Sequence, residues 1–134
     1  DMEDEAKAPF KTILFLGSAR DAPAPWGGPS RLGDRVLSFV ESRVAEWNKA
    51  NTGFDVEVFD PLKHPAFQRV MGNPTFYMGK NVPADLQELT DKVAAADCYL
   101  IVTPEYNHSM PPALVNMMDY FGGSKYAYKP SGCV

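Results

Sequence analysis

The chain has 134 residues, of which 45% are hydrophobic, and its formal net charge is −4 at pH 7. This length suits a single domain, and the hydrophobic fraction excludes a disordered chain. The negative charge and the lack of a basic cluster argue against nucleic-acid binding, and no apolar stretch reaches the roughly 20 residues that span a bilayer.

Residues 1–5 read Asp-Met-Glu-Asp-Glu. This start lacks the positive region and the apolar run of a signal peptide, so we expect an acidic, disordered tail over residues 1–10 and a cytoplasmic protein. The two cysteines, Cys98 and Cys133, show neither Cys-x-x-Cys nor Cys/His zinc spacing. They therefore predict a reducing compartment and no metal site.

The first expected element is a strand over residues 12–16, a continuous apolar run that stops at Gly17. Runs without alternation are typical of parallel strands that are buried on both faces. After a loop rich in proline and glycine, residues 30–49 show a helical pattern with Ser30 as a plausible N-cap. Spacings of three and four predict one apolar face for this helix, made of Leu32, Val36, Phe39, Val40, Val44 and Trp47.

Residues 54–59 predict a second strand, whose partial alternation places it nearer a sheet edge. Residues 60–82 keep no period and contain several prolines and glycines, so we expect an irregular excursion over the surface. Pro83 then opens a second helix that ends near Asp97. Its inward side chains are expected to be Leu86, Leu89, Val93 and Ala94.

Residues 98–102 predict a third strand, and residues 111–121 a third helix that Pro111 favours at its first position. Residues 129–134 look like the opening of a fourth strand. This alternation predicts an α/β fold with a parallel sheet and right-handed crossovers. Because ligands of such sheets bind beyond the carboxyl ends of the strands, we expect the site at the loops after the first and third strands.

The loop after the first strand has the features of an anion site. It places Ser18 and Arg20, together with Ser30 and Arg31, near a helix N-terminus whose amides and dipole attract anions. Neither Gly-x-Gly-x-x-Gly nor a Walker lysine is present, which counts against dinucleotide and nucleoside-triphosphate sites. A tight turn with an ordinary N-cap and solvated arginines explains this loop equally well.

The loop over residues 103–111 is more distinctive. Its prolines fix the backbone, Tyr106 offers a flat face, and Asn107 offers both a donor and an acceptor. This combination suits a planar heterocycle with polar edges, although prolines can also serve rigidity alone. His108 could serve acid–base chemistry, but without matching ligands a metal is not expected there.

Residues 103–121, TPEYNHSMPPALVNMMDYF, resemble the flavin-contacting loop and following helix of the NADPH-dependent FMN reductases, a family that includes quinone and azo-dye reductases. GSAR at residues 17–20 resembles the family's phosphate loop, and KPSGCV at residues 129–134 resembles the start of its fourth strand. Val115 stands where the family has lysine, and residues 21–29 look like an insertion. The resemblance implies a flavodoxin-like FMN-binding domain over residues 11–134, with helices on both faces of a parallel sheet.

The resemblance also implies FMN as cofactor, with hydride passing from NADPH or NADH through FMN to a small acceptor such as a quinone or azo compound. No side chain is expected to be catalytic, because the flavin carries the chemistry, and Tyr106 is expected to act as a wall. The FMN phosphate would be held by Ser18, Arg20, Ser30 and Arg31. The isoalloxazine would be lined by Pro104, Glu105, Tyr106, Asn107 and Ser109.

Family members continue past the fourth strand, so the resemblance implies a C-terminally truncated chain with an incomplete sheet. We expect a homodimer or other homo-oligomer, or a complementing C-terminal fragment, to cover the open flank, and no nucleic-acid or membrane partner. Two alternatives remain open. One is a flavin-binding electron carrier, and the other is a truncated, non-catalytic interaction or scaffold chain.

Overall fold

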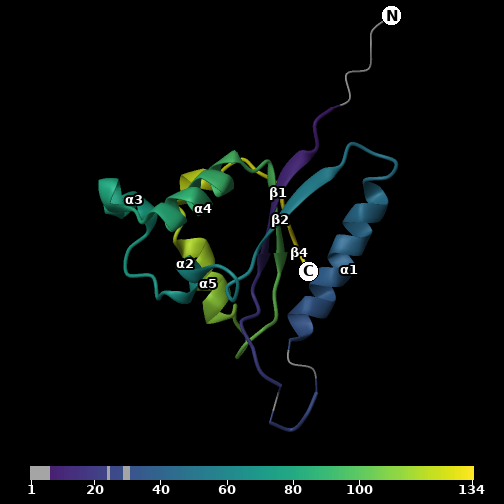
Figure 1. The fold of residues 1–134 in the computed structure, drawn as a ribbon, viewed down its shortest axis with the longest axis horizontal. Helices are drawn as coiled ribbons and strands as arrows, with labels where there is room; N and C mark the ends of the chain where they lie inside the picture. The colour runs from purple at the N-terminus through teal and green to yellow at the C-terminus, as the bar shows by residue number, and fades with distance from the viewer. Residues whose placement is uncertain (1–6, 24, 29–30) are drawn as a thin grey trace, which may run out of the picture.

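The computed structural model describes residues 7–23, 25–28 and 31–134, so most of the tail expected over residues 1–10 lies outside the described residues. The described chain forms a parallel sheet of strand order β2-β1-β3-β4 with helices on both faces (Figure 1). The expected α/β class and parallel pairing are confirmed. No helix of the described residues is long and apolar enough to cross a membrane.

Strand β1, Phe10–Leu16, lies at the centre of the sheet between β2, Phe54–Phe59, and β3, Cys98–Val102. Its last four side chains, from Ile13 on, are at most 4% exposed, as its unbroken apolar run predicts. Strand β2 forms one edge, as its alternation predicts. The other edge is β4, Ser131–Cys133, a short strand whose residues are all exposed.

Helix α1, Leu32–Trp47, lies against one face of the sheet. Arg31 occupies its N-cap position, so the expectation of an N-cap at Ser30 is wrong by one residue, and Ser30 itself lies outside the described residues. The expected buried face is also wrong in part, because Leu37 and Val40 are buried whereas most of the expected residues are exposed. The cause is that the apolar arc of α1 is wider than the strip that contacts the sheet. The expected residues that are exposed are Leu32, Val36, Phe39 and Trp47.

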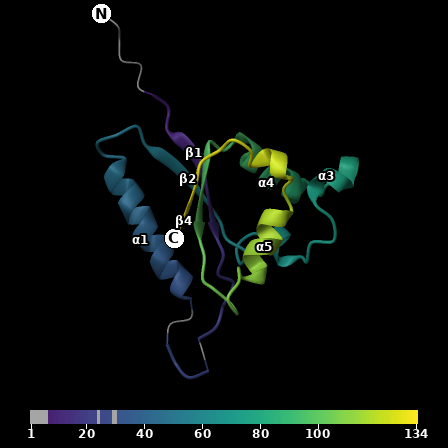
Figure 2. The same ribbon diagram turned by 180° about the vertical axis from the view of Figure 1, so that it is seen from behind.

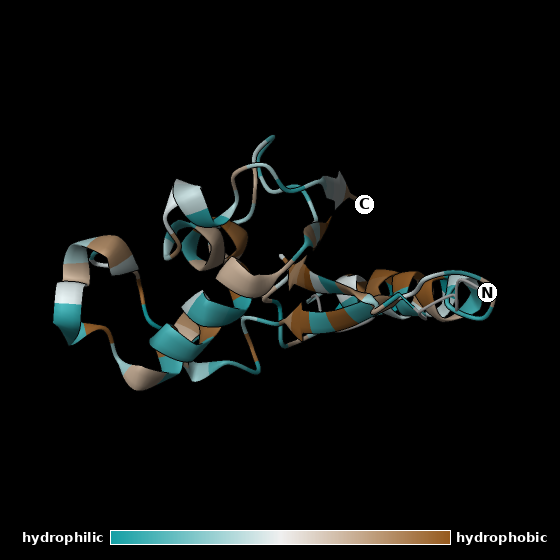
Figure 3. Ribbon diagram, turned by 90° about the horizontal axis from the view of Figure 1, so that it is seen from above, coloured by the Kyte–Doolittle hydropathy of each residue, from teal (hydrophilic) through white to brown (hydrophobic). Residues whose placement is uncertain are grey.

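The opposite face is covered by α4, Ala84–Ala95, and α5, Pro112–Asp119, together with shorter helices (Figure 2). In α4, Leu86, Leu89 and Val93 are buried as expected, but Ala94 is exposed. Thr90 is buried instead, because its hydroxyl donates to the Leu86 carbonyl at 2.8 Å and so needs no water. A view from above shows apolar residues on the strands and on α1 beside them (Figure 3).

The segment between β2 and α4 is not the irregular surface excursion that the sequence suggests. It contains helices α2, Pro65–Gln68, and α3, Thr75–Met78, and the 3₁₀ turn η1, Gly79–Asn81. Phe67 is 4% exposed and packs edge-on against Phe121. Asn116 of α5 ties the segment down, because its side chain accepts from the Met71 amide at 2.8 Å. Helices of one turn are too short for a periodic pattern, which is why the sequence does not reveal them.

After α5, the 3₁₀ turn η2, Gly123–Lys125, leads the chain back to β4. Lys129, just before β4, donates from Nζ to the Ala94 carbonyl at 2.7 Å. This hydrogen bond satisfies a backbone carbonyl at the C-terminal end of α4. The chain thus returns to the amino-terminal edge of the sheet before β4 begins. The opposite, carboxyl-terminal edge is left to the loops that follow β1, β2 and β3.

Candidate functional site

The loops after β1 and β3 meet at the carboxyl-terminal edge of the sheet, at the bottom of Figure 1. The Gly17 amide donates to the Val102 carbonyl at 2.7 Å. A Cβ on Gly17 would lie 2.9 Å from Thr103 Oγ1, so only glycine allows this approach. The two loops that the sequence selects are therefore brought into direct contact.

The first loop is anchored at Ser18, which is 4% exposed. The first turn of α1 packs on it, because a Cβ on Gly33 would lie 2.8 Å from Ser18 Cβ. The 16 residues of α1 start here, so its free amides point to the region of the loop. Arg20 is half-buried two residues later, and Ser30 lies outside the described residues.

Arg31 is 7% exposed and binds Asp60, the residue that directly follows β2. Its Nη1 donates to Asp60 Oδ2 and its Nη2 to Asp60 Oδ1, both at 2.8 Å. Nη2 also donates to the Ser18 carbonyl, and Nη1 lies 3.3 Å from Oδ1 of Asp34. Arg31 Nε is buried and has no partner among the described residues.

Asp60 is a buried carboxylate, 1% exposed. Burial by itself would raise the pKa of Asp60, but hydrogen bonds from Arg31 and from the Leu62 amide, with the charges of Arg31 and Lys63, hold it below the ordinary value of 3.8. The Asp60 carboxylate is thus charged at neutral pH.

The second loop contains a tight turn. Asn107 and His108 both have positive φ, 51° and 59°, as the central residues of a type I′ turn do. Tyr106 and Ser109 flank them and exchange two backbone hydrogen bonds of 3.0 Å. Asparagine and histidine are among the residues that tolerate this left-handed conformation, so Asn107 has a backbone reason to be present besides any ligand.

The side chains of this loop are open to solvent. Tyr106 is 42% exposed, and Glu105, Asn107 and Ser109 are also exposed, whereas Pro104 is half-buried. His108 Nδ1 lies 3.2 Å from Glu105 Oε1, but both side chains are exposed, so the pair contributes little.

The residues present fit an anionic, planar ligand such as FMN. The buried Ser18, a helix N-terminus and two glycine-dependent close approaches form one cradle after β1. The rigid turn beside it presents an aromatic ring. The individual ligand residues stay predictions, and the described part of the chain offers no group of three or more metal-binding side chains.

Sequence reasoning missed Asp60 and the packing role of Gly33. Asp60 carried a usable signal, because it directly follows β2 at the ligand-binding edge of the sheet. The role of Gly33 could not be predicted, because it depends on how closely α1 approaches Ser18.

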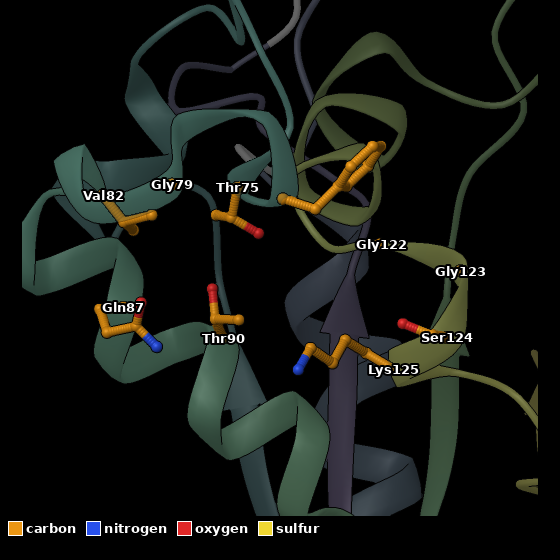
Figure 4. A pocket seen from close by; sticks show the side chains of 10 residues that line it. Thr75, Gly79, Val82, Gln87, Thr90, Gly122, Gly123, Ser124 and Lys125 are labelled. Atoms are coloured by element: carbon orange, nitrogen blue, oxygen red, sulfur yellow. The ribbon is translucent and has the colours of Figure 1, made fainter.

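A separate cavity of about 510 Å³ lies between α3, α4 and the η2 turn (Figure 4). Thr75 and Thr90 face one another across it, but their hydroxyls already donate to the carbonyls of Tyr120 and Leu86. None of its lining residues belongs to the two loops. We therefore do not assign the flavin to this cavity.

Known proteins resemble this chain in sequence. A family model described as NADPH-dependent FMN reductase matches residues 10–134. An NAD(P)H-dependent FMN reductase of Schizosaccharomyces pombe is 26% identical over 111 residues, covering 82% of this chain and 50% of that protein. An NADPH azoreductase of Bacillus sp. is 39% identical over 57 residues, covering 40% of this chain and 32% of that protein. The chain thus spans half or less of the length of these two relatives.

Two solved structures share the flavodoxin-like fold. The flavoenzyme NAD(P)H:(acceptor) oxidoreductase FerB of Paracoccus denitrificans superposes with a TM-score of 0.59 at 19% identity, covering 93% of this chain and 59% of that one. An oxidoreductase of Corynebacterium diphtheriae gives a TM-score of 0.63 at 16% identity, covering 95% and 63%. The family match extends from the first strand to the last, and the chain belongs to the NADPH-dependent FMN reductase family.

Proposed function

We propose that this chain is the FMN-binding part of an NAD(P)H-dependent oxidoreductase that reduces a small acceptor, such as a quinone or an azo compound. The observation that carries the proposal is the contact between the two loops at the carboxyl edge of β1 and β3. One loop offers anion donors at a helix start, and the other offers an aromatic ring on a rigid turn. The FMN-binding domain spans residues 11–134.

The chemistry that FMN supplies when bound is hydride acceptance from NADPH or NADH and onward electron transfer. The chain's residues bind and orient it. Ser18 and Arg20, with Ser30, donate to the phosphate, and the amides at the start of α1 add to the positive field. The loop over residues 104–107, with Ser109, lines the ring mainly through its backbone, and Tyr106 acts as a wall.

The names of the relatives support the choice of reaction, since an FMN reductase and an azoreductase are among them. The two free cysteines, Cys98 and Cys133, suit a reducing compartment such as the cytoplasm. A flavin-binding electron carrier and a non-catalytic scaffold remain the alternative functions. Each makes a different prediction in the experiment below.

A companion polypeptide belongs to the proposal, either a second copy or a C-terminal fragment. Its support is apolar surface on the α1 side of the sheet. Leu32 and Phe39 of α1 are 53% and 60% exposed beside a groove of about 400 Å³. A second, largely apolar groove of about 560 Å³ lies over the sheet, with Leu100 and Gly132 in its lining. Apolar side chains that are exposed together on one face are a feature of protein interfaces.

The experiment is NAD(P)H oxidation by the purified protein with FMN and a quinone or azo acceptor. We expect oxidation that requires both FMN and the acceptor. FMN binding without NAD(P)H oxidation would favour the electron carrier. Absence of FMN binding, in a protein shown to be folded by cooperative unfolding, would favour the scaffold.

A further inference from the structure

We infer that Arg31 and Asp60 are positioning residues of the phosphate loop, which hold the Ser18 carbonyl and thereby the donors that face the FMN phosphate. The inference rests on the proposed FMN site and deepens it. Arg31, which the sequence suggests as a direct phosphate ligand, acts through Asp60 instead.

The geometry commits the outer nitrogens of Arg31 to the protein. Both Nη atoms donate to Asp60 at 2.8 Å, in the parallel, two-pronged arrangement that suits guanidinium and carboxylate. Nη2 donates in addition to the Ser18 carbonyl. The guanidinium therefore joins the end of β2 to the loop after β1, and all three residues are at least nine-tenths buried.

Asp60 is itself held in place by hydrogen bonds just after the end of β2. Its Oδ1 accepts from the Leu62 amide at 2.9 Å, and its backbone carbonyl accepts from the Lys63 and His64 amides at 3.1 Å each. These hydrogen bonds fix the position of the Asp60 carboxylate, and Arg31 is held against it.

Ser18 is held from a second side by α1. With no Cβ on Gly33, the first turn of the helix comes into direct contact with the Ser18 side chain. The loop is thus held between α1 and the Arg31–Asp60 pair, and a change in either should displace its donors. Positioning of this kind matters because a charge-assisted contact depends on distance and direction.

The two roles for Arg31 predict opposite effects when the charge of Asp60 is removed. If Arg31 were simply a phosphate ligand, Asp60 would compete for it and repel the phosphate, so Asp60→Asn should strengthen FMN binding. If the pair positions the loop, Asp60→Asn should loosen Arg31 and Ser18 and weaken FMN binding, against the electrostatic trend.

The experiment is a titration of wild type and Asp60→Asn with FMN and with riboflavin, which lacks the phosphate, followed by flavin fluorescence. We expect FMN affinity to fall roughly tenfold and riboflavin affinity to change by less than about twofold, because only the phosphate contact is displaced. The matched control is Asp85→Asn, which removes the carboxylate of another arginine–aspartate pair. Arg69 Nη2 lies 3.1 and 2.9 Å from the two Asp85 oxygens, outside both loops, and this control should leave both affinities unchanged.

Unchanged or stronger FMN binding by Asp60→Asn overturns the inference, and so does an equal loss for both flavins, which would mean general loosening. If Asp60→Asn lacks cooperative unfolding, Asp60→Glu decides in the same titration, because it keeps the charge but moves the carboxylate. The same selective loss is expected, and an unchanged FMN affinity overturns the inference. A wild-type protein that does not prefer FMN over riboflavin overturns the proposed site itself, and the inference with it.

Discussion

At the scale of single residues, the two arginines of the phosphate loop have different expected roles. Arg31 is bound to Asp60, and Arg20 lies half-buried farther along the same loop. Because a guanidinium hydrogen-bonds to phosphate more strongly than a neutral donor does, we expect Arg20 to contribute more to phosphate binding than the Ser18 hydroxyl.

We expect Arg20→Ala to weaken FMN binding by roughly 1.5–3 kcal/mol, the range for a hydrogen bond to a charged group. Riboflavin binding should change little, because riboflavin has no phosphate. Flavin fluorescence titrations of both ligands measure the difference. Equal losses for the two ligands would remove Arg20 from the phosphate site.

The buried pair also predicts a pH dependence of stability. The pKa of Asp60 in the folded protein is below its ordinary value of 3.8, so the stabilisation is fully present above that value and is lost as pH falls toward the folded-state pKa. We expect Asp60→Asn to be less stable than wild type by roughly 3–5 kcal/mol near neutral pH, as for other broken buried pairs. Urea unfolding should show this gap narrowing below about pH 4. A gap that stays constant from pH 6 to pH 2 would contradict the assignment.

At the scale of elements, the second loop has two roles that can be tested separately. It forms a tight turn, and it is expected to contact the flavin ring. Asn107 has positive φ, which glycine adopts without strain. We expect Asn107→Gly to keep the thermal midpoint within a few degrees and to weaken FMN and riboflavin binding alike, because the ring is common to both. Asn107→Val should lower the stability by about 1–2 kcal/mol through backbone strain. If Asn107→Gly leaves both affinities unchanged, Asn107 serves the turn only.

Tyr106 gives an independent test of the same loop. Tyr106 is 42% exposed and is expected to act by shape, so Tyr106→Phe should keep most of the reductase activity of the wild type. Its pH profile should also match that of the wild type. Loss of one limb of a bell-shaped profile in the variant would show that the phenol acts as an acid.

Elements that carry their signal along the chain were predictable. The unbroken apolar run of β1 and the spacing of Leu86, Leu89 and Val93 in α4 predicted burial correctly, whereas β3 is fully buried only at Tyr99 and Val102. The exposed stripe of α1 was not predictable, because periodicity gives the width of an apolar arc and not the part that meets the sheet. In the site, the two loops followed from topology, but the Arg31–Asp60 pair joins residues 29 positions apart and needed coordinates.

At the scale of the whole molecule, α1 covers only part of its face of the sheet. The exposed apolar residues of α1 and the groove over β3 and β4 lie on the same side as the α1 core. At about 25 cal/mol per Å² of apolar area, covering each 100 Å² of this surface would contribute about 2.5 kcal/mol, against a net stability of ~5–15 kcal/mol for a whole domain.

We therefore expect light scattering to show a species larger than the 14.8 kDa chain, with mass spectrometry identifying either a second copy or a fragment in the same peak. Phe39→Glu, on the exposed side of α1, should shift the protein to the smaller species. The matched control is Glu41→Lys, which also changes the charge of an exposed α1 residue, but outside the groove. A protein that is monomeric and unfolds cooperatively without a companion polypeptide would contradict this expectation.

The most direct test of the account is a flavin titration of the wild-type protein, comparing FMN with riboflavin. The account predicts saturable binding of one FMN per chain, with FMN preferred over riboflavin by roughly tenfold or more, the effect of one charge-assisted phosphate contact. Absence of FMN binding by the folded protein, or equal affinity for the two flavins, would contradict the placement of the FMN phosphate in the loop after β1.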